Sequence, residues 1–99
     1  MNDLTAFQRD ILYIVGGADE PHGLAIKSDL EAYYGTDVNH GRLYPNLDQL
    51  VNAGLINKGE YDKRTNRYTL TSDGEEVLKT RREWEDDHLD TVWVAHATD

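Results

Sequence analysis

The fold is decided by the stretch Asn39-His-Gly-Arg-Leu-Tyr-Pro-Asn-Leu-Asp-Gln-Leu-Val-Asn-Ala-Gly54. Apolar side chains recur in it at intervals of three and four residues, which is the pattern of one buried helical face. Asn39 is a suitable N-cap, because its side-chain oxygen can accept a hydrogen bond from a first-turn amide. Gly54 is placed to end the helix in a left-handed conformation. The predicted apolar stripe consists of Leu43, Leu47, Leu50 and Val51.

Pro45 leaves two starting points open for this helix. A proline inside a helix loses a backbone hydrogen bond and crowds the preceding turn. The same residue fits the first helical position well. The helix can therefore begin directly after Asn39 or at Pro45 itself.

The face opposite the apolar stripe is polar. Arg, Asn and Gln side chains can form paired hydrogen bonds with the edges of DNA bases. The face therefore fits either an ordinary solvated surface or a DNA-reading helix, and the neighbouring segments must decide. It carries Gly41, Arg42, Pro45, Gln49 and Asn52, with Tyr44, Asn46 and Asp48 at its edges.

Size and composition exclude several classes of protein. A chain of 99 residues is about one domain with a modest core. The absence of cysteine excludes disulfides, a thiol redox switch and a cysteine zinc site. No secretion signal is recognisable, and no apolar run approaches the ~20 residues of a membrane-spanning helix. A cytoplasmic protein without membrane contact is expected.

Charge is distributed unevenly along the chain, whose net charge is −9. Residues 39–68 hold five bases and three acids, or +2, whereas the remainder holds five bases and 16 acids, or −11. A locally positive segment on an acidic body fits a nucleic-acid surface. The excess of 12 Asp over 7 Glu, with only 4 Lys, fits a halophilic protein, and a merely acidic small protein is the alternative.

Two further helices are expected before Asn39. Thr5 and Gln8 form a capping box, and the apolar face behind it belongs to the core or to a dimer surface. Residues 24–34 form the next helix, which Gly35 ends. Two short helices separated by about four residues make a helix-turn-helix candidate. The expected buried positions are Leu4, Phe7, Ile11, Ile14 and Val15 in the first helix, and Leu24, Ile26, Leu30, Tyr33 and Tyr34 in the second.

After Gly54 the period changes to that of a β-hairpin. Residues 55–61 and 67–70 are short β-prone runs, and residues 62–66 between them are turn-like. Charge at a hairpin tip can simply keep an edge strand from aggregating. Positive charge in an otherwise acidic chain favours phosphate contact instead. The polar side chains of the tip are Lys63, Arg64, Asn66 and Arg67.

The last segment predicts one long helix. Ser72 and Glu75 form a second capping box, and no Gly or Pro follows Gly74. Its apolar face extends beyond what so small a core requires, and such faces usually pair with another chain. We therefore expect residues 1–74 to form the main domain and residues 75–99 a dimerisation helix. That face carries Val77, Leu78, Arg81, Trp84, His88 and Val92.

Several spaced motifs between Phe7 and Trp84 resemble the PadR family of transcriptional regulators. They are His22-Gly23, Gly41-Arg42-Leu43-Tyr44-Pro45, Gly54-Leu55-Ile56, Arg67-Tyr68 and Leu70-Thr71-x-x-Gly74. The resemblance implies an α+β, mainly α, fold: a winged helix-turn-helix with a two-stranded wing and a long C-terminal dimerisation helix. It also favours Pro45 inside the recognition helix. The length after Trp84 is similar to that of the small family members.

The resemblance further implies a homodimeric repressor on a near-palindromic operator in double-stranded DNA. The recognition helix, residues 39–53, would enter the major groove, and the wing, residues 61–68, would lie on the backbone or minor groove. Arg42, where the family more commonly has a small hydroxyl residue, would read guanine or grip a phosphate. The expected DNA contacts are Asn39, His40, Gly41, Arg42, Tyr44, Pro45, Asn46, Gln49, Lys63, Arg64, Asn66 and Arg67, and the expected dimer contacts are Leu4, Phe7, Ile11, Val77, Arg81, Trp84, His88 and Val92.

Two alternatives to DNA binding stay open. The net charge fits a protein-interaction module that kept the fold without binding DNA. Trp84 and Trp93 could wall an effector pocket at the dimer interface, although interfacial Trp more often packs. Neither an enzyme nor a bound metal or cofactor is expected. No nucleophile–base pair is recognisable, and Asp86-Asp87-His88 lacks further ligands at a fixed spacing.

Overall fold

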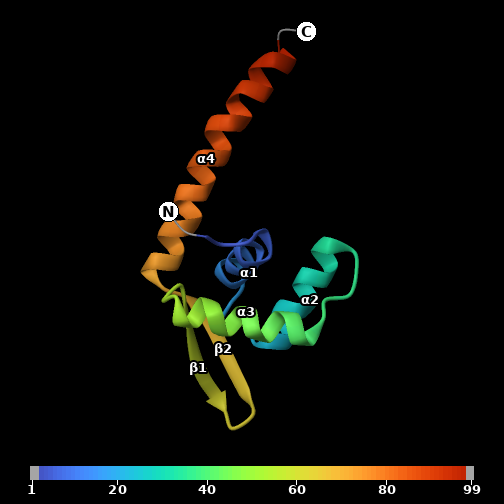
Figure 1. The fold of residues 1–99 in the computed structure, drawn as a ribbon, viewed down its shortest axis with the longest axis vertical. Coiled ribbons are helices and arrows are strands. Elements are labelled where there is room, and N and C mark those ends of the chain that lie inside the picture. Colours follow the sequence, from blue (N-terminus) through green and yellow to red (C-terminus); the bar gives the residue numbers. More distant parts are fainter. Residues whose placement is uncertain (1–2, 98–99) are drawn as a thin grey trace.

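The computed structural model describes residues 3–97, which form four helices and one two-stranded sheet. The order is α1 (Ala6–Gly17), α2 (Gly23–Tyr34), α3 (His40–Asn52), β1 (Ile56–Asp62), β2 (Thr65–Leu70) and α4 (Ser72–Ala97). Figure 1 shows α1, α2 and α3 gathered above the hairpin, with α4 projecting away on the opposite side. The winged helix-turn-helix prediction is confirmed.

The first two helices supply the centre of the core. The Thr5 side chain accepts from the Gln8 amide while Gln8 accepts from the Thr5 amide, so the predicted capping box is present. Ile26 and Leu30 of α2 are fully buried, and Gly35 ends this helix at a φ of 71°. Two expected core residues of α2 are wrong, because Leu24 and Tyr33 are 59% and 74% exposed. Only one side of α2 meets α1 and α3, and these two side chains lie outside it.

The predicted recognition helix forms with Pro45 inside it. α3 begins at His40, and the Asn39 side chain caps it by accepting from the Gly41 amide over 2.6 Å. The alternative start at Pro45 is therefore wrong. Leu43, Leu47 and Leu50 are buried, so the apolar stripe faces the core as its period predicts.

The hairpin is longer and its turn tighter than its sequence indicates. β1 and β2 pair antiparallel from Ile56–Leu70 to Asp62–Thr65, which leaves only Lys63 and Arg64 as the turn. A bulge between Glu60 and Asp62 interrupts the register. The hairpin also docks sideways on the loop before α2, because the Tyr68 amide donates to the Pro21 carbonyl over 3.0 Å. The wing is therefore held at its base.

α4 is capped one residue earlier than predicted. The Thr71 hydroxyl accepts from the Gly74 amide and donates to the Gly54 carbonyl, so Thr71 rather than Ser72 caps the helix, which begins at Ser72. Gly74 is required here, because a Cβ at that position would overlap the Leu55 carbonyl oxygen. Thr71 and Gly74 thus join α4 to the segment that follows α3.

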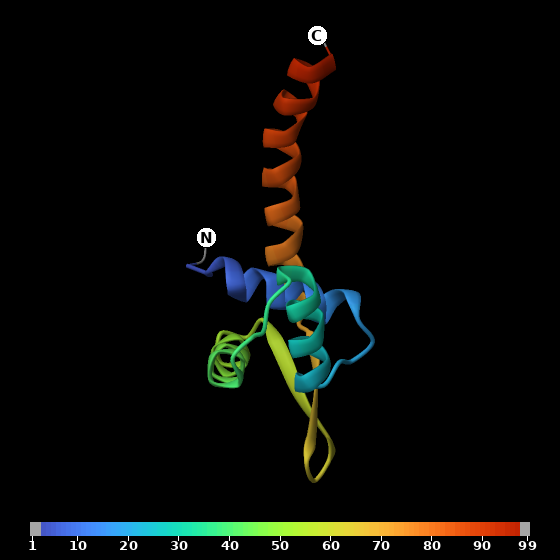
Figure 2. The same cartoon turned by 90° about the vertical axis from the view of Figure 1, so that its right-hand side faces the viewer.

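Three expected dimer contacts belong to the core of the protomer instead. Phe7, Ile11 and Val77 are buried among the other core side chains, so they offer almost no surface to a second chain. Leu4 is partly buried against the same cluster. The C-terminal part of α4 extends away from the domain (Figure 2). Its side chains Trp84, Leu89, Val92 and Trp93 are all exposed. None of the helices in residues 3–97 is long and apolar enough to cross a membrane.

Candidate nucleic-acid interface

The polar face of α3 and the hairpin turn lie at the same end of the molecule. Figure 1 shows α3 running across the base of the helical domain, with the hairpin descending beside it and α4 pointing away. Gly41, Arg42, Pro45, Gln49 and Asn52 of this face are all exposed. The residues of the +2 segment are thus brought to one surface, which we call the α3–hairpin surface (residues 39–52 and 58–67).

Arg42 lies at the edge of this surface that meets α1. Its guanidinium carbon lies 3.8 Å from the ring centroid of Phe7, a distance at which the charge is attracted to the aromatic face. The residue is nevertheless exposed. Phe7 therefore sets the direction of the Arg42 side chain while leaving its guanidinium accessible to a ligand.

Asn46 and Gln49 are both held by Gln8 of α1. The Gln8 side-chain amide donates to Asn46 Oδ1 over 3.0 Å and to Gln49 Oε1 over 2.9 Å. Asn46 also donates its own amide to the Arg42 carbonyl over 2.7 Å. The oxygen and one N–H of Asn46 are thus bonded within the chain, which leaves one N–H donor, and its role as a DNA contact stays a prediction.

Gln8 is the functional residue that sequence reasoning missed. It is a buried polar side chain, 8% exposed, in the part of the chain that the structure describes. A signal was available: a capping box uses only the oxygen of its glutamine amide and leaves two N–H donors unassigned. Their partners lie 38 and 41 residues further along the chain, so only the tertiary structure identifies them.

Tyr44 connects α3 to the start of α2. Its ring lies 4.3 Å, centroid to centroid, from the ring of His40 one turn earlier, with the two ring planes tilted by 36°. Its hydroxyl reaches Gly23 so closely that a Cβ on Gly23 would overlap it. Glycine at residue 23 and tyrosine at residue 44 are thus linked sterically, because a side chain at residue 23 would displace Tyr44.

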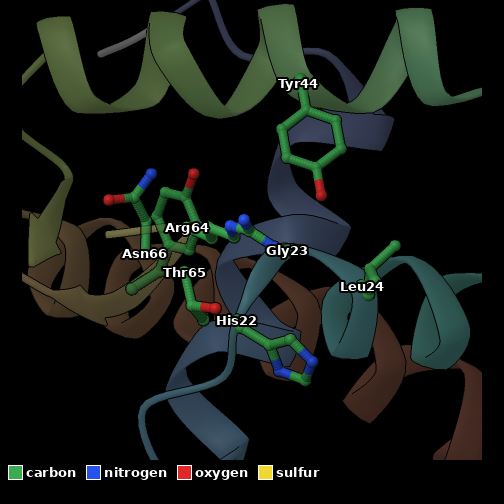
Figure 3. Close-up of a pocket in the computed structure, with 8 residues that line it drawn as sticks. His22, Gly23, Leu24, Tyr44, Arg64, Thr65 and Asn66 are labelled. Atoms are coloured by element: carbon green, nitrogen blue, oxygen red, sulfur yellow. The ribbon is translucent and has the colours of Figure 1, made fainter. Parts of the chain in front are cut away.

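A pocket of about 150 Å³ opens between α2, α3 and the hairpin. Figure 3 shows the Tyr44 side chain descending from α3 and the Arg64 side chain extending from the hairpin toward the first residues of α2. His22 precedes α2 without capping it through its side chain, so first-turn amides of α2 have no side-chain cap. Free amides at a helix start, a phenol hydroxyl and a guanidinium all suit an anion. The lining residues are His22, Gly23, Leu24, Tyr44, Arg64, Thr65, Asn66 and Tyr68.

The cations of the hairpin divide into two groups. Lys63 and Arg64 at the turn form no ion pair with any residue in 3–97. Arg67, by contrast, stacks on Tyr61 at 4.4 Å and donates to the Glu20 carbonyl over 3.1 Å, so it braces the hairpin against the preceding loop. Lys58 lies 3.9 Å from Asp48 of α3. The positive charge available to a ligand is therefore concentrated at the turn.

Two carboxylates hold the turns that border this surface. Glu31 accepts from the Val38 amide over 2.8 Å, and this hydrogen bond, followed by that from Lys27, lowers the pKa of Glu31. Asp62 accepts from the Arg64 amide over 2.8 Å, which lowers the pKa of Asp62. Both groups are ionised at neutral pH, so the loop into α3 and the hairpin turn are each tied by a charged acceptor.

Comparison with known proteins finds a matching family and similar solved structures. Residues 11–80 match the model of the transcriptional regulator PadR-like family. RosR of Halobacterium salinarum is 47% identical, with 97% of this chain and 96% of that chain covered, at a TM-score of 0.81. An RosR–S1 complex is equally similar, with a TM-score of 0.81.

Two further comparisons are also informative. Transcriptional activator GvpE2 of Halobacterium salinarum is 37% identical over 54 residues, which are 54% of this chain but only 26% of that protein. This chain thus matches about a quarter of the length of GvpE2. The FabT protein of Streptococcus pneumoniae, solved in complex with DNA, shares the fold at a TM-score of 0.73 and 17% identity, with 91% of this chain and 60% of that chain covered.

Proposed function

The chain belongs to the PadR-like family of transcriptional regulators, and from this we propose that it is a cytoplasmic, sequence-specific DNA-binding repressor that acts as a homodimer. The family and its relative RosR are regulators rather than enzymes. In our proposal α3 enters the major groove and the hairpin acts as a wing on the adjacent backbone or minor groove.

The observation that carries this proposal is the placement of the positively balanced segment 39–68. The hairpin, whose turn carries Lys63 and Arg64, lies on the side of the domain that holds α3 and opposite to α4 (Figure 1). A protein-interaction module would not need such a separation of charge on a chain of net charge −9. DNA binding explains it, because phosphates require cations at the surface that they meet.

The pocket at the junction of α2, α3 and the hairpin fits a backbone phosphate. Tyr44 can donate its hydroxyl, Arg64 can neutralise the charge, and the first amides of α2 can donate from below (Figure 3). A phosphate held there would fix the depth at which α3 lies in the groove, because Tyr44 belongs to α3 itself. Phosphate contacts position a protein on DNA, and base contacts select the sequence.

Arg42 has two roles that an experiment can separate. Its exposed guanidinium, stacked on Phe7, could form a bidentate pair with guanine or hold a phosphate. If Arg42 pairs with guanine, Arg42→Ala should cost about 1–3 kcal/mol at one base position and relax specificity there. An equal loss of affinity on every sequence would mark a phosphate contact.

Dimerisation is supported by the shape of α4. This helix of 26 residues gives the chain a Cα radius of gyration of 15.5 Å, against about 13 Å for a compact 100-residue domain. Trp84, Leu89 and Val92 lie near one side of it, and each is more than 40% exposed. A second copy of the same helix would cover them, and two copies would present two α3 helices to a near-palindromic site.

The proposal is tested by selecting sites from a random duplex library at high salt and sequencing what the protein retains. We expect a two-fold motif with half-sites about 10 base pairs apart. A promoter carrying that motif should then be silenced by the protein in a reporter assay, whereas stimulation would make the protein an activator. No enrichment from a folded dimer would favour the protein-interaction module.

A further inference from the structure

Gln8 orients a side chain of the α3–hairpin surface from outside that surface. It lies on α1, outside the α3–hairpin surface, and is buried. Its side chain makes three hydrogen bonds: Oε1 accepts from the Thr5 amide over 3.1 Å, and Nε2 donates to Asn46 and to Gln49. Both halves of its amide are therefore occupied, and its orientation is fixed by the capping box.

This fixed amide also fixes the polarity of Gln49. Because Gln8 presents donors, Gln49 must turn its oxygen toward α1 and its NH₂ group away from it. That NH₂ group makes no hydrogen bond within residues 3–97, and Gln49 is exposed. Asn46 is less available, because one N–H of its NH₂ group is bonded to the Arg42 carbonyl and the residue is half-buried. The polar face of α3 thus offers a donor at this position.

We propose that Gln8 is a specificity-determining residue that acts through Gln49, and this inference rests on the proposed entry of α3 into the major groove. A free glutamine pairs with adenine by donating to N7 and accepting from N6. With its oxygen turned toward Gln8, Gln49 can only donate. It therefore selects bases that present acceptors in the major groove, guanine through O6 and N7, thymine through O4 or adenine through N7 alone, and disfavours cytosine, which presents only a donor.

Gln8→Glu is the sharpest test. It keeps the acceptor for the Thr5 amide but replaces the donor that faces Asn46 and Gln49 with an acceptor. A glutamate at this position still accepts from the Thr5 amide, as capping boxes commonly have it. It has no donor for Asn46 or Gln49, so both amides should rotate and donate to the carboxylate. Gln49 would then turn its oxygen outward and select bases that present a donor, adenine or cytosine.

The experiment is the library selection on the full-length protein, with the wild type, Gln8→Glu and Gln49→Ala in parallel. Gln49→Ala should flatten one position in each half-site and so identify the base that Gln49 reads. At that position the wild type should disfavour cytosine relative to guanine or thymine by roughly 5- to 150-fold, the range of one good base contact. Gln8→Glu should admit cytosine and disfavour guanine and thymine at that position alone. A uniform loss of affinity is also expected, since the variant adds a negative charge.

Controls separate this role from simple support of the fold. Thr5→Val removes the hydroxyl that caps α1 but leaves the Thr5 amide and the hydrogen bonds from Gln8 to Asn46 and Gln49. The DNA motif that this variant selects should therefore equal that of the wild type. Should Gln8→Glu fail to fold, Gln8→Met serves in its place. It leaves Gln49 free to rotate, so it should widen the same position to accept cytosine.

The outcomes distinguish the two proposals. A wild type that enriches no motif contradicts DNA reading itself, and this inference with it. A wild-type motif that Gln8→Glu and Gln8→Met leave unchanged, with both variants folded, overturns the role of Gln8 alone. A change at positions other than the one that Gln49→Ala flattens would also overturn it.

Discussion

The α3–hairpin surface and the outer segment of α4 (residues 81–93) hold their exposed side chains in different ways. On the first, side chains are fixed from elsewhere in the chain: Arg42 by Phe7, Gln49 by Gln8 and Arg67 by Glu20. On the second, most contacts lie within the same helix, such as Arg81 and His88 against Trp84. One link reaches the domain, from the Tyr13 hydroxyl to Glu85 over 3.3 Å.

This difference indicates which of the two regions needs a binding partner to fix its side chains. Pre-formed side chains bind a ligand with little loss of conformational entropy, so the α3–hairpin surface is prepared for recognition. The outer segment of α4 leaves apolar side chains in water and gains stability only when another surface covers them. The predictions below test whether the two ends are as different as this comparison states.

The largest effect is expected at the outer segment of α4. Trp84→Glu should yield a folded monomer, because Trp84 is 49% exposed and lies outside the core. Affinity for a two-fold site should fall by about 100-fold, since the two half-sites are no longer bound together. Analytical ultracentrifugation and DNA titration measure the two effects. Glu83→Gln, on the far side of the helix, is the matched control and should change neither.

A smaller but still large effect is expected where α2 meets α3. Gly23→Ala places a Cβ against Tyr44, which should lower the free energy of unfolding by about 1–3 kcal/mol. Gly17→Ala, where nothing lies within 4 Å of the added carbon, is the control and should be neutral or stabilising by up to about 1 kcal/mol. Urea denaturation compares them. Equal behaviour of the two variants would contradict the steric role of Gly23.

A third effect concerns the anion pocket. Arg64→Ala should weaken DNA binding by about tenfold on every sequence, because a phosphate contact carries no sequence information. Arg82→Ala removes an equal charge from α4, where Arg82 is paired only with Asp86 at 4.0 Å. This control should bind DNA like the wild type. A loss of affinity with Arg64→Ala that is confined to one base position would instead make Arg64 a base-reading residue.

The scaffold behind the surface is tested by pH. Burial, and then the hydrogen bond to Asp10, raises the pKa of Tyr34 from 10.0 to about 12. Between these values the folded chain retains a proton that the unfolded chain has released, so stability must fall as the pH rises through this window. Tyr34→Phe should cost about 1 kcal/mol at pH 8 and should make the fall between pH 10 and 12 shallower.

Tyr33→Phe is the matched control for this experiment. Tyr33 is 74% exposed, and its hydroxyl makes no hydrogen bond in the described residues 3–97. Its stability should follow that of the wild type at every pH. Urea denaturation at pH 8, 10 and 11 provides the measurement. If Tyr34→Phe had the same pH dependence as the wild type, the titration of Tyr34 would not be the cause of the fall in stability.

The smallest effect is expected from salt. DNA binding normally weakens steeply with salt, because neutralised phosphates release counterions. Here Asp48 and Asp62 lie beside the cations of the α3–hairpin surface, and cations taken up between carboxylates and phosphates would oppose that release. We predict a flattened or reversed slope. A steep loss of affinity between about 0.1 and 1 M salt, with the protein folded throughout, would refute this prediction.

The amino-acid sequence by itself determined the order and type of the elements. Local signals suffice for these features: Thr5 and Asn39 as caps, Gly35 as a stop, and the leucine period of α3. It misplaced features that depend on distant neighbours. The cap of α4 is Thr71 rather than the predicted Ser72, because the Thr71 hydroxyl is held by the Gly54 carbonyl. Leu24 and Tyr33 were predicted to be buried but are exposed, because they lie outside the side of α2 that meets α1 and α3.

Only the tertiary structure decided which polar side chains of α3 are free. The sequence positions of Asn46 and Gln49 indicate equally that each could contact DNA bases. In the structure, however, the two side chains make different hydrogen bonds. Gln8 and Phe7 reach α3 across more than 30 residues of chain, and no local pattern records such a contact. Helical period fixes which side of a helix is polar, whereas packing against other elements fixes which polar atoms remain available to a ligand.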